Sequence, residues 1–487
     1  MCRVPELRKT TDEKRVQPAG EYVLYWMTSA RRTRYNFSLE RAIEHSRALS
    51  KPLLVFEPLR IDYPWAAPRF HRFVIEGMQD QARAFADAGV TYFPFVERHE
   101  GEGSGLLEAL ASRACVVVTD LFPCSFYPRM IDAARLRIQV TLETVDSNGL
   151  MPVAGVDRHY STAHSFRRLL QRELPTQLLT LPLAEPLSRL PRVPAAVVPP
   201  ECLRRHPAVT ADEFRDPGPL LTELHIDHEV STVGLRGGER SGRIRLETFL
   251  HERLSRYAEA RNHPEDPVTS GLSPWLHFGH LASAEVFARI IQIEDWDSSR
   301  LAQRASGSRA GWWGMSEAAE GYLDQLITWR ELGFNLCDRV PHYDQFESLP
   351  DWARRTLEEH EGDTRTPSYR LQVFENAETH DPLWNAAQVQ LRREGYIHNY
   401  LRMLWGKKVL HWASSPREAF EILVELNNKY ALDGRDPNSY SAIGWIFGRF
   451  DRAWGPERPI FGKVRYMSSE NTARKVRVRG YIRSYAE

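Results

Sequence analysis

The sequence predicts an α/β domain with a doubly wound parallel sheet, followed by an all-α domain. In the first half of the 487-residue chain, short apolar runs alternate with segments of helical spacing, which is typical of parallel strands joined by crossover helices. From Arg245 onward the apolar spacing is mostly helical and shows no clear strand alternation. No GxGxxG motif follows the first expected strand, so the standard dinucleotide-binding fingerprint is missing.

The apolar runs of the first half predict the individual strands. We expect buried strands at 21–27, 51–58, 90–96, 114–121 and 138–146, with helical segments such as 70–88 between them. Residues 185–240 are rich in Pro and Gly, which predicts a connector on the surface. The expected division is an N-terminal extension (1–20), an α/β domain (21–184), a connector (185–244) and a helical domain (245–487).

Composition limits the class of partner and the compartment. The formal net charge is zero, so any nucleic-acid site must be a local basic patch. The basic run from Lys463 to Arg483 is either solvated or grips phosphates. Five scattered cysteines show no metal-ligand spacing and fit a reducing cytosol. With no long apolar run and no leader, we expect a cytoplasmic protein without a membrane segment.

Residues 398–454 form the most informative segment. Arg402 lies in a helical stretch otherwise rich in Leu, Met and Trp, and a buried cation needs a partner, which Asp433 in the following Asp-Gly turn could supply. Trp405 and Trp412 are seven residues apart and therefore share one helix face. Large aromatics around an ion pair indicate a flat, polar-edged cofactor in an apolar helical pocket.

Other motifs each support two interpretations. The hydroxyls and N–H groups of the loop from Thr269 to Ser273 suit a phosphate, although Ser-Pro is also an ordinary helix start. Trp329 lies on an apolar helix face and is either a core or a site residue. Trp384 joins Trp405 and Trp412 as a candidate line of redox-active indoles, and spacing alone equally allows simple packing.

Taken in order, several segments resemble the photolyase/cryptochrome family, most closely the class II cyclobutane pyrimidine dimer photolyases. They include TSGLSPWLHFG, DQLITWRE, THDPLWNAAQ, RMLWGKKVLHW and LDGRDPNSY. The resemblance implies a helical domain that binds FAD, active as FADH⁻, and an α/β domain that can hold an antenna chromophore such as a deazaflavin or a folate. It also implies light-driven repair of UV-damaged DNA, by electron transfer to a flipped-out pyrimidine dimer, in a protein associated with the nucleoid and without an obligate protein partner.

The resemblance assigns roles to residues by position. FAD contacts are expected from Tyr257, Thr269, Ser270, Gly271, Leu272, Ser273, Arg402, Asn427, Asp433, Gly434 and Ser439. Arg402 and Asp433 correspond to the ion pair over the flavin ring, and Asn427 to the residue that faces flavin N5; these three are expected to be catalytic. The electron relay corresponds to Trp384, Trp405 and Trp412. Substrate contacts are expected from Arg261, Asn262, Gln325, Trp329, Asn399, Met403 and Trp445, with Trp329 and Trp445 as the aromatic pair that holds the dimer.

Several positions depart from the class II pattern. Gln325 stands where class II enzymes usually have Glu, Asn399 where close relatives have Gly, and Ser439 where DPNGY has Gly. The stretch after Trp445 is one residue shorter, and 298–316 resembles an insertion whose two tryptophans, Trp312 and Trp313, are expected to be exposed or gating. Two alternatives therefore stay open: a cryptochrome-like blue-light flavoprotein without repair activity, and a photolyase with altered lesion specificity, such as one for (6-4) lesions.

Overall fold

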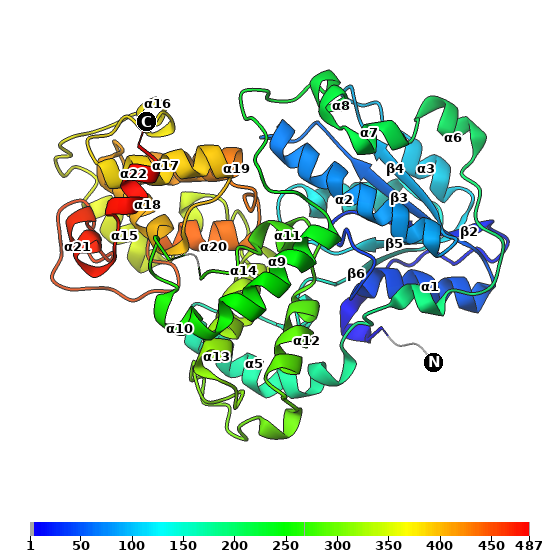
Figure 1. Cartoon of the computed structure of the whole chain (residues 1–487), viewed down its shortest axis with the longest axis horizontal. Helices are drawn as coiled ribbons and strands as arrows, with labels where there is room; N and C mark the ends of the chain where they lie inside the picture. The colour runs from blue at the N-terminus through cyan, green and yellow to red at the C-terminus, as the bar shows by residue number, and fades with distance from the viewer. Residues whose placement is uncertain (1–3, 267, 487) are drawn as a thin grey trace. The chain divides into compact units, whose positions relative to one another are not determined.

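The computed structural model describes residues 4–266 and 268–486, and the chain divides into two compact units (Figure 1). The first, here called the α/β unit, comprises Met1–Asp157, Glu173–Glu247 and Gly271–Ser298. The second, the helical unit, comprises Arg158–Arg172, Thr248–Ser270 and Ser299–Glu487. The chain therefore enters the helical unit more than once before its long C-terminal stretch.

The α/β unit is built on a six-stranded sheet in the order β1-β6-β5-β2-β3-β4. The strands are β1 (Lys9–Thr11), β2 (Tyr22–Trp26), β3 (Leu53–Leu59), β4 (Thr91–Val96), β5 (Ala114–Asp120) and β6 (Leu142–Val145). All neighbours are parallel except β1 and β6, which are antiparallel. The doubly wound parallel sheet is thus confirmed. The edge strand β1 was not expected, because three polar residues carry no apolar alternation.

Both faces of this sheet are covered by helices. Val23, Tyr25 and Met27 pack with α1 (Phe37–Leu49) and α2 (Pro68–Asp87) in one apolar cluster. The alternate residues of β2 pack with α3 (Leu106–Ala111), α4 (Tyr127–Arg137) and α6 (Pro200–Arg205) in another. Burial on both faces explains why the strands read as continuous apolar runs. The Pro-rich connector contains the short helices α6, α7 (Ala211–Arg215) and α8 (Gly218–Glu223).

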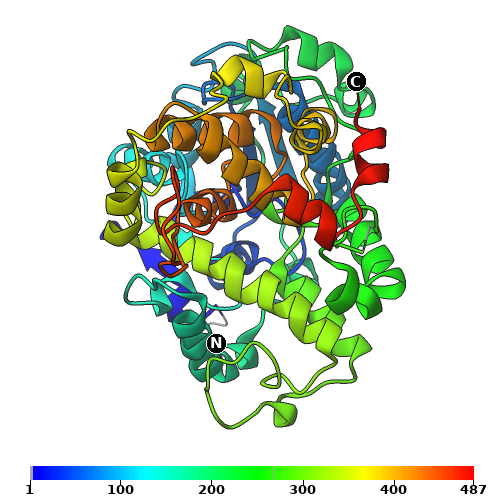
Figure 2. The same cartoon turned by 90° about the vertical axis from the view of Figure 1, so that its left-hand side faces the viewer.

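Helices and loops make up the described residues of the helical unit (Figures 1 and 2). Its main helices are α10 (Tyr257–Ala260), α13 (Glu317–Leu323), α14 (Arg330–Arg339), α15 (Asp351–Glu359), α16 (Leu371–Glu375), α17 (Pro382–Glu394), α18 (Asn399–Trp412), α19 (Pro416–Tyr430), α20 (Pro437–Ile446), α21 (Ser469–Lys475) and α22 (Arg479–Ser484). A π-helical turn, η7 (Asp324–Trp329), connects α13 to α14. Side-chain caps from Asp381, Ser415 and Asp436, each followed by Pro, start α17, α19 and α20.

Two of the remaining helices, α5 (Ala163–Gln177) and α9 (Glu239–Glu252), carry residues of both units. The other two, α11 (Ser273–His277) and α12 (Ser283–Ile293), belong to the α/β unit. No helix in the described part of the chain has both the length and the apolarity needed to span a bilayer.

The segment 298–316 is packed into the structure, so the expectation that its tryptophans are exposed is wrong, while a gating role for them stays a prediction. Trp312 and Trp313 are only 4% and 7% exposed, and their rings meet edge to face at 4.7 Å. Two residues on α5 hold the segment: Gln171 accepts from Gly307 N and donates to Ser308 O, while Arg167 donates to Gly307 O. Hydrogen bonds between the backbone of this loop and side chains of α5 therefore fix its position.

Candidate functional site

The expected partnership of Arg402 and Asp433 is present within the helical unit. Arg402 Nη2 lies 3.1 Å from Asp433 Oδ1, and the two side chains are 17% and 14% exposed. The Asp-Gly turn is held tightly: Ser439 Oγ donates to Asp433 O at 2.8 Å, and a Cβ on Gly434 would lie 2.8 Å from Asn427 O. Gly434 is therefore required for the close approach of this turn to α19.

Asn427 lies on α19 beside this turn in a network of amides. Its side chain is buried, and its Nδ2 donates to Asn428 Oδ1 at 3.2 Å. Asn428 in turn donates to the Tyr440 hydroxyl at 3.2 Å and accepts from Arg435 N at 2.9 Å. These contacts fix the orientation of the Asn427 amide.

Hydroxyl groups gather around α10 and the loop that follows it. Tyr257 is buried, its ring packs edge to face against Tyr322 at 5.2 Å, and the Arg261 guanidinium lies 5.7 Å from its centroid. Burial raises the pKa of Tyr257. Ser270 hydrogen-bonds the Tyr322 side chain, and the Thr269 hydroxyl lies 3.5 Å from that of Tyr396.

The rest of that loop belongs to the α/β unit. Gly271 has a φ of +64°, and a Cβ there would meet the Arg245 guanidinium at 2.5 Å. Leu272 is the N-cap of α11 and Ser273 its first residue, with no side-chain cap. The expected phosphate contacts thus divide between the two units, with Thr269 and Ser270 in the helical one. The roles expected of Gly271, Leu272 and Ser273 stay predictions.

The residues of the helical unit fit a flat cofactor with a polar edge. Only Nη2 of Arg402 is engaged by Asp433, and a guanidinium carries five N–H donors. Both members of the pair keep some exposure, so they can still reach a ligand. The oriented Asn427 amide adds polar groups suited to the carbonyl and ring-nitrogen edge of a flavin, and the apolar face of α18 offers a surface for its ring.

The three candidate relay tryptophans form a contiguous array. Trp384 and Trp405 stack with centroids 6.4 Å apart at 8°, and Trp384 meets Trp412 at 6.3 Å and 68°. The spatial order is therefore Trp405, Trp384, Trp412. Trp384 Nε1 donates to Trp405 O at 2.9 Å, and Trp405 Nε1 donates to Gln388 Oε1 at 3.0 Å. Both acceptors are amide oxygens, which hold the indole N–H groups in place and are too weakly basic to remove their protons.

The Trp412 end of the array has polar neighbours that the sequence did not single out. Lys408 Nζ lies 5.0 Å from the ring centroid of Trp412, and the rings of His380 and Tyr369 lie 4.8 and 5.9 Å away. The Tyr369 hydroxyl is 2.8 Å from His380 Nδ1. A motif search for indoles could not find these groups, because they come from the loops on either side of α16 and from α18.

The expected aromatic pair of the substrate site is also assembled. Trp329 and Trp445 stack with centroids 4.8 Å apart at 18°, and both are partly exposed. Trp329 ends the π-helical turn η7, and Gln325 lies four residues earlier in the same turn, also partly exposed. Single π-helical turns occur frequently at functional sites. Helix α20, which carries Trp445, packs against α14 and α18.

The other expected substrate residues lie at accessible places in the helical unit. Asn399 is exposed and Met403 partly exposed near the start of α18, while Arg261 is partly exposed and Asn262 exposed just after α10. Their shared role stays a prediction.

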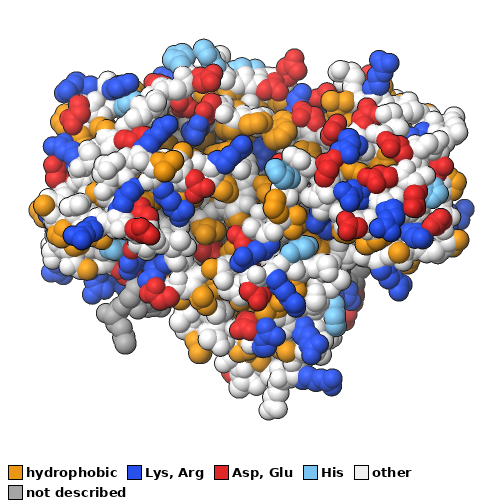
Figure 3. Space-filling view, turned by 180° about the vertical axis from the view of Figure 1, so that it is seen from behind, with side chains coloured by type: hydrophobic (Ala, Val, Ile, Leu, Met, Phe, Trp, Pro, Cys, Tyr) orange, Lys and Arg blue, Asp and Glu red, His pale blue; other side chains and the backbone are white. Residues whose placement is uncertain are grey.

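Basic residues lie near the C-terminus, as expected, although part of their charge is paired. Lys463 forms an ion pair with Glu457 at 3.0 Å. Arg452 and Arg465 lie 4.9 and 5.2 Å from the ring centroid of Trp454, which is 37% exposed. On the face drawn in Figure 3, Lys and Arg are interspersed with Asp and Glu.

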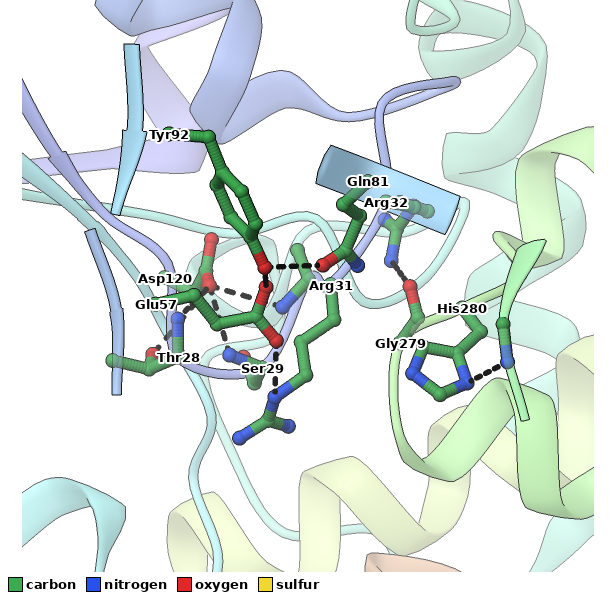
Figure 4. Close-up of polar contacts among 12 residues, drawn as sticks. Thr28, Ser29, Arg31, Arg32, Glu57, Gln81, Tyr92, Asp120, Gly279 and His280 are labelled. Atoms are coloured by element: carbon green, nitrogen blue, oxygen red, sulfur yellow. Dashed lines mark hydrogen bonds and ion pairs between the residues drawn. The ribbon is translucent and has the colours of Figure 1, made fainter. Parts of the chain in front are cut away.

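The α/β unit holds a buried polar cluster at the carboxyl ends of its strands (Figure 4). Asp120, at the end of β5, accepts from the N–H groups of Thr28, Ser29 and Ala30 at 2.8 to 2.9 Å. Glu57 on β3 pairs with Arg31 at 3.3 Å and accepts from the Tyr92 hydroxyl at 2.6 Å. Burial raises the pKa of Glu57 to about 7. In the sequence, this cluster is indicated by charged residues within apolar strand patterns, namely Glu57 and Asp120.

Among the described residues, no three His, Cys, Asp or Glu side chains are grouped to hold a metal.

Comparison with known proteins identifies the family. No family model matches the chain. The chain is 34% identical over 469 residues to the deoxyribodipyrimidine photo-lyase of Methanothermobacter thermautotrophicus, covering 95% of this chain and 94% of the relative. Relatives of the same name from Arabidopsis thaliana and Potorous tridactylus are each 30% identical, covering 99% and 98% of this chain and 92% and 84% of the relatives.

Solved structures show the same fold. A class III photolyase from Agrobacterium tumefaciens has a TM-score of 0.66 at 17% identity, covering 96% of this chain and 86% of that one. The cryptochrome of Synechocystis sp. PCC6803 has a TM-score of 0.64 at 14% identity, covering 95% and 88%. At such identities the structural likeness establishes the fold alone. The relatives that match this chain at 30% identity or more over nearly its whole length show that it belongs to the deoxyribodipyrimidine photolyase family.

Proposed function

We propose that this protein is a light-driven lyase that repairs cyclobutane pyrimidine dimers in DNA. The observation that carries the proposal is the Trp329–Trp445 pair, two partly exposed indoles stacked at 4.8 Å, with Gln325 on the same turn as Trp329. Such a surface suits a flat, unstacked base. The relatives named deoxyribodipyrimidine photo-lyase support this assignment.

The cofactor that this reaction needs is FAD. Proteins of this family bind flavin, and the helical unit offers the Arg402–Asp433 pair and the Asn427 amide for its ring. Ser270 and Thr269 offer hydroxyls for its phosphate and ribityl chain. Bound reduced FAD supplies the light-driven electron that opens the dimer. The protein supplies binding, orientation and electrostatics.

The tryptophan array suits delivery of electrons to that cofactor from outside. Each step between neighbouring indoles spans 6.3 to 6.4 Å between centroids. Trp405 and Trp384 donate to amide oxygens, so neither has a base to which it can lose its proton. Trp412 lies among polar side chains. It is the end of the array at which an oxidised tryptophan can be reduced again by an external electron donor. The array therefore restores the reduced state without taking part in dimer opening.

The substrate surface works by accepting an extruded lesion. A damaged base pair stacks poorly in the duplex, so its extrusion costs less than that of an intact pair. Stacking on indoles returns about 1–3 kcal/mol per base. Gln325 can donate and accept hydrogen bonds at the base edge. Arg452 and Arg465, with the exposed Trp454 between them, suit contacts to the DNA backbone that carry no sequence information.

The test is repair by the purified, chemically reduced protein. Oligothymidine that contains dimers is illuminated with blue light, and the return of thymine absorbance is followed, with a dark sample as control. Light-dependent recovery is expected. Flavin photoreduction without recovery would overturn the dimer assignment and make (6-4) DNA the next substrate. Absorbance of the same preparation tests for an antenna, because a deazaflavin or a folate adds a band to that of flavin.

A further inference from the structure

The last turn of α20, which carries Trp445, is held from α18 by a buried lysine. Lys407 is 1% exposed, and its Nζ donates to the backbone carbonyl of Ile446, the residue after Trp445. The two helices touch at this point, since a Cβ on Gly406 would collide with Ile446 Cδ1. Lys407 therefore reaches the carbonyl inside a tightly packed helix contact.

The neighbouring carbonyls of this helix end are satisfied by the chain itself. Gly444 O accepts from Phe447 N and Arg449 N at 3.1 and 2.9 Å, and Trp445 O accepts from Gly448 N at 3.1 Å. The Ile446 carbonyl instead accepts a hydrogen bond from Lys407 Nζ. The last carbonyls of a helix lack intrahelical partners, and the negative end of the helix dipole favours a cation there. The ammonium thus completes the C-terminal cap of α20.

The charge on Lys407 depends on the segment that follows Trp445. Burial lowers the pKa of Lys407 to about 7; Asp451 acts to raise it and Arg465 to lower it. A neutral amine still donates a hydrogen bond, so the contact with Ile446 persists in both protonation states.

Helix α18, which contributes Lys407, also carries Arg402 and Trp405. The lysine therefore links the helix of the proposed cofactor site to the aromatic wall of the proposed lesion site.

We propose that Lys407 is a positioning residue for lesion binding, which acts by fixing the last turn of α20 and with it the indole of Trp445. The inference rests on the proposed function, because it takes Trp445 as a contact of the dimer. Without the amino group of Lys407, the Ile446 carbonyl is buried without this donor, and the turn shifts to satisfy it. Trp445 then stacks less well on Trp329 and on a lesion.

The test is a double-mutant cycle on lesion affinity measured in the dark. Full-length holoprotein is prepared as wild type, Lys407→Met, Trp445→Ala and the double variant, and each is titrated with dimer-containing and with undamaged DNA. Lys407→Met is expected to weaken binding of the dimer about tenfold, and to change it by less than about twofold when combined with Trp445→Ala. Lys51→Met, at a partly buried lysine of the α/β unit, is the control and should leave lesion affinity unchanged.

The outcomes separate the two claims. A wild type that does not prefer the dimer overturns the proposed function, whatever Lys407 does. A wild type that prefers it, with Lys407→Met equally tight, overturns the role of Lys407. Equal losses with and without the Trp445→Ala substitution also overturn it, because they would mean a general structural effect. If Lys407→Met fails to retain flavin, Lys407→Gln enters the same cycle, since its shorter neutral amide suits a buried position but cannot reach as far.

Discussion

The indole of Trp384 donates a hydrogen bond to the backbone carbonyl of Trp405 while the two rings stack at 8°. This bond uses the backbone of Trp405, so it survives a change of the Trp405 side chain. The indole of Trp405 can therefore be removed while the indole of Trp384 keeps its hydrogen bond. A substitution of Trp405 therefore tests its role in electron transfer without displacing Trp384.

We expect Trp405→Phe to abolish photoreduction of the flavin while leaving it bound. Phenylalanine keeps the apolar packing but is much harder to oxidise than an indole, so the array loses its member next to Trp384. Absorbance during illumination with an external reductant measures the effect, and chemically reduced Trp405→Phe should still open dimers. Trp296→Phe, in the α/β unit, is the control. Unimpaired photoreduction in Trp405→Phe would show that electrons do not pass through this array.

Gln325→Glu is expected to raise the yield of dimer repair. Gln325 can form hydrogen bonds but has no proton to share with a dimer that gains an electron, whereas a carboxyl has one. The variant should also gain a dependence of yield on pH, as the new carboxyl titrates. The measurement is the number of dimers opened per absorbed photon across a pH series. An unchanged yield at every pH would mean that Gln325 does not limit the reaction.

The α/β unit should lose stability as pH rises from about 4.5 to about 7 because of Glu57. Burial raises the pKa of this carboxyl from 4.5 to about 7, so between these values the folded protein keeps a proton that the unfolded chain has released. The contribution is fully present below about pH 4.5 and is lost as pH rises through 7, by up to ~3 kcal/mol. Glu57→Gln should flatten this part of the curve of unfolding free energy against pH. Glu21→Gln, at an exposed carboxyl, should leave the curve as steep as in the wild type.

Trp312→Ala is expected to destabilise the helical unit without changing lesion preference. Trp312 is 4% exposed and packs on Trp313, and truncation of a buried aromatic costs about 3–5 kcal/mol. Thermal unfolding measures the loss, and the ratio of affinities for damaged and undamaged DNA should stay at the wild-type value. A changed ratio in a protein of unchanged stability would support a gating role for the segment 298–316.

Several features followed from the sequence because local patterns determine them. The expected strands from 21–27 to 138–146 all formed, because strands buried on both faces must be apolar throughout. The pairing of Arg402 with Asp433 could also be anticipated, since a cation among apolar residues needs a counter-charge. The family resemblance depended on the order of short motifs, which is a property of the chain itself.

Tertiary structure decided the arrangements that join distant segments. The order Trp405, Trp384, Trp412 differs from the order along the chain, because α17 and α18 pack side by side. The stacking of Trp329 on Trp445 and the cap that Lys407 gives to α20 come from helix packing that no spacing encodes. The segment that carries the buried Trp312 and Trp313 is hydrogen-bonded to α5, more than a hundred residues earlier. Sequence thus determined which residue types are available, and packing over long sequence separations determined which of them meet.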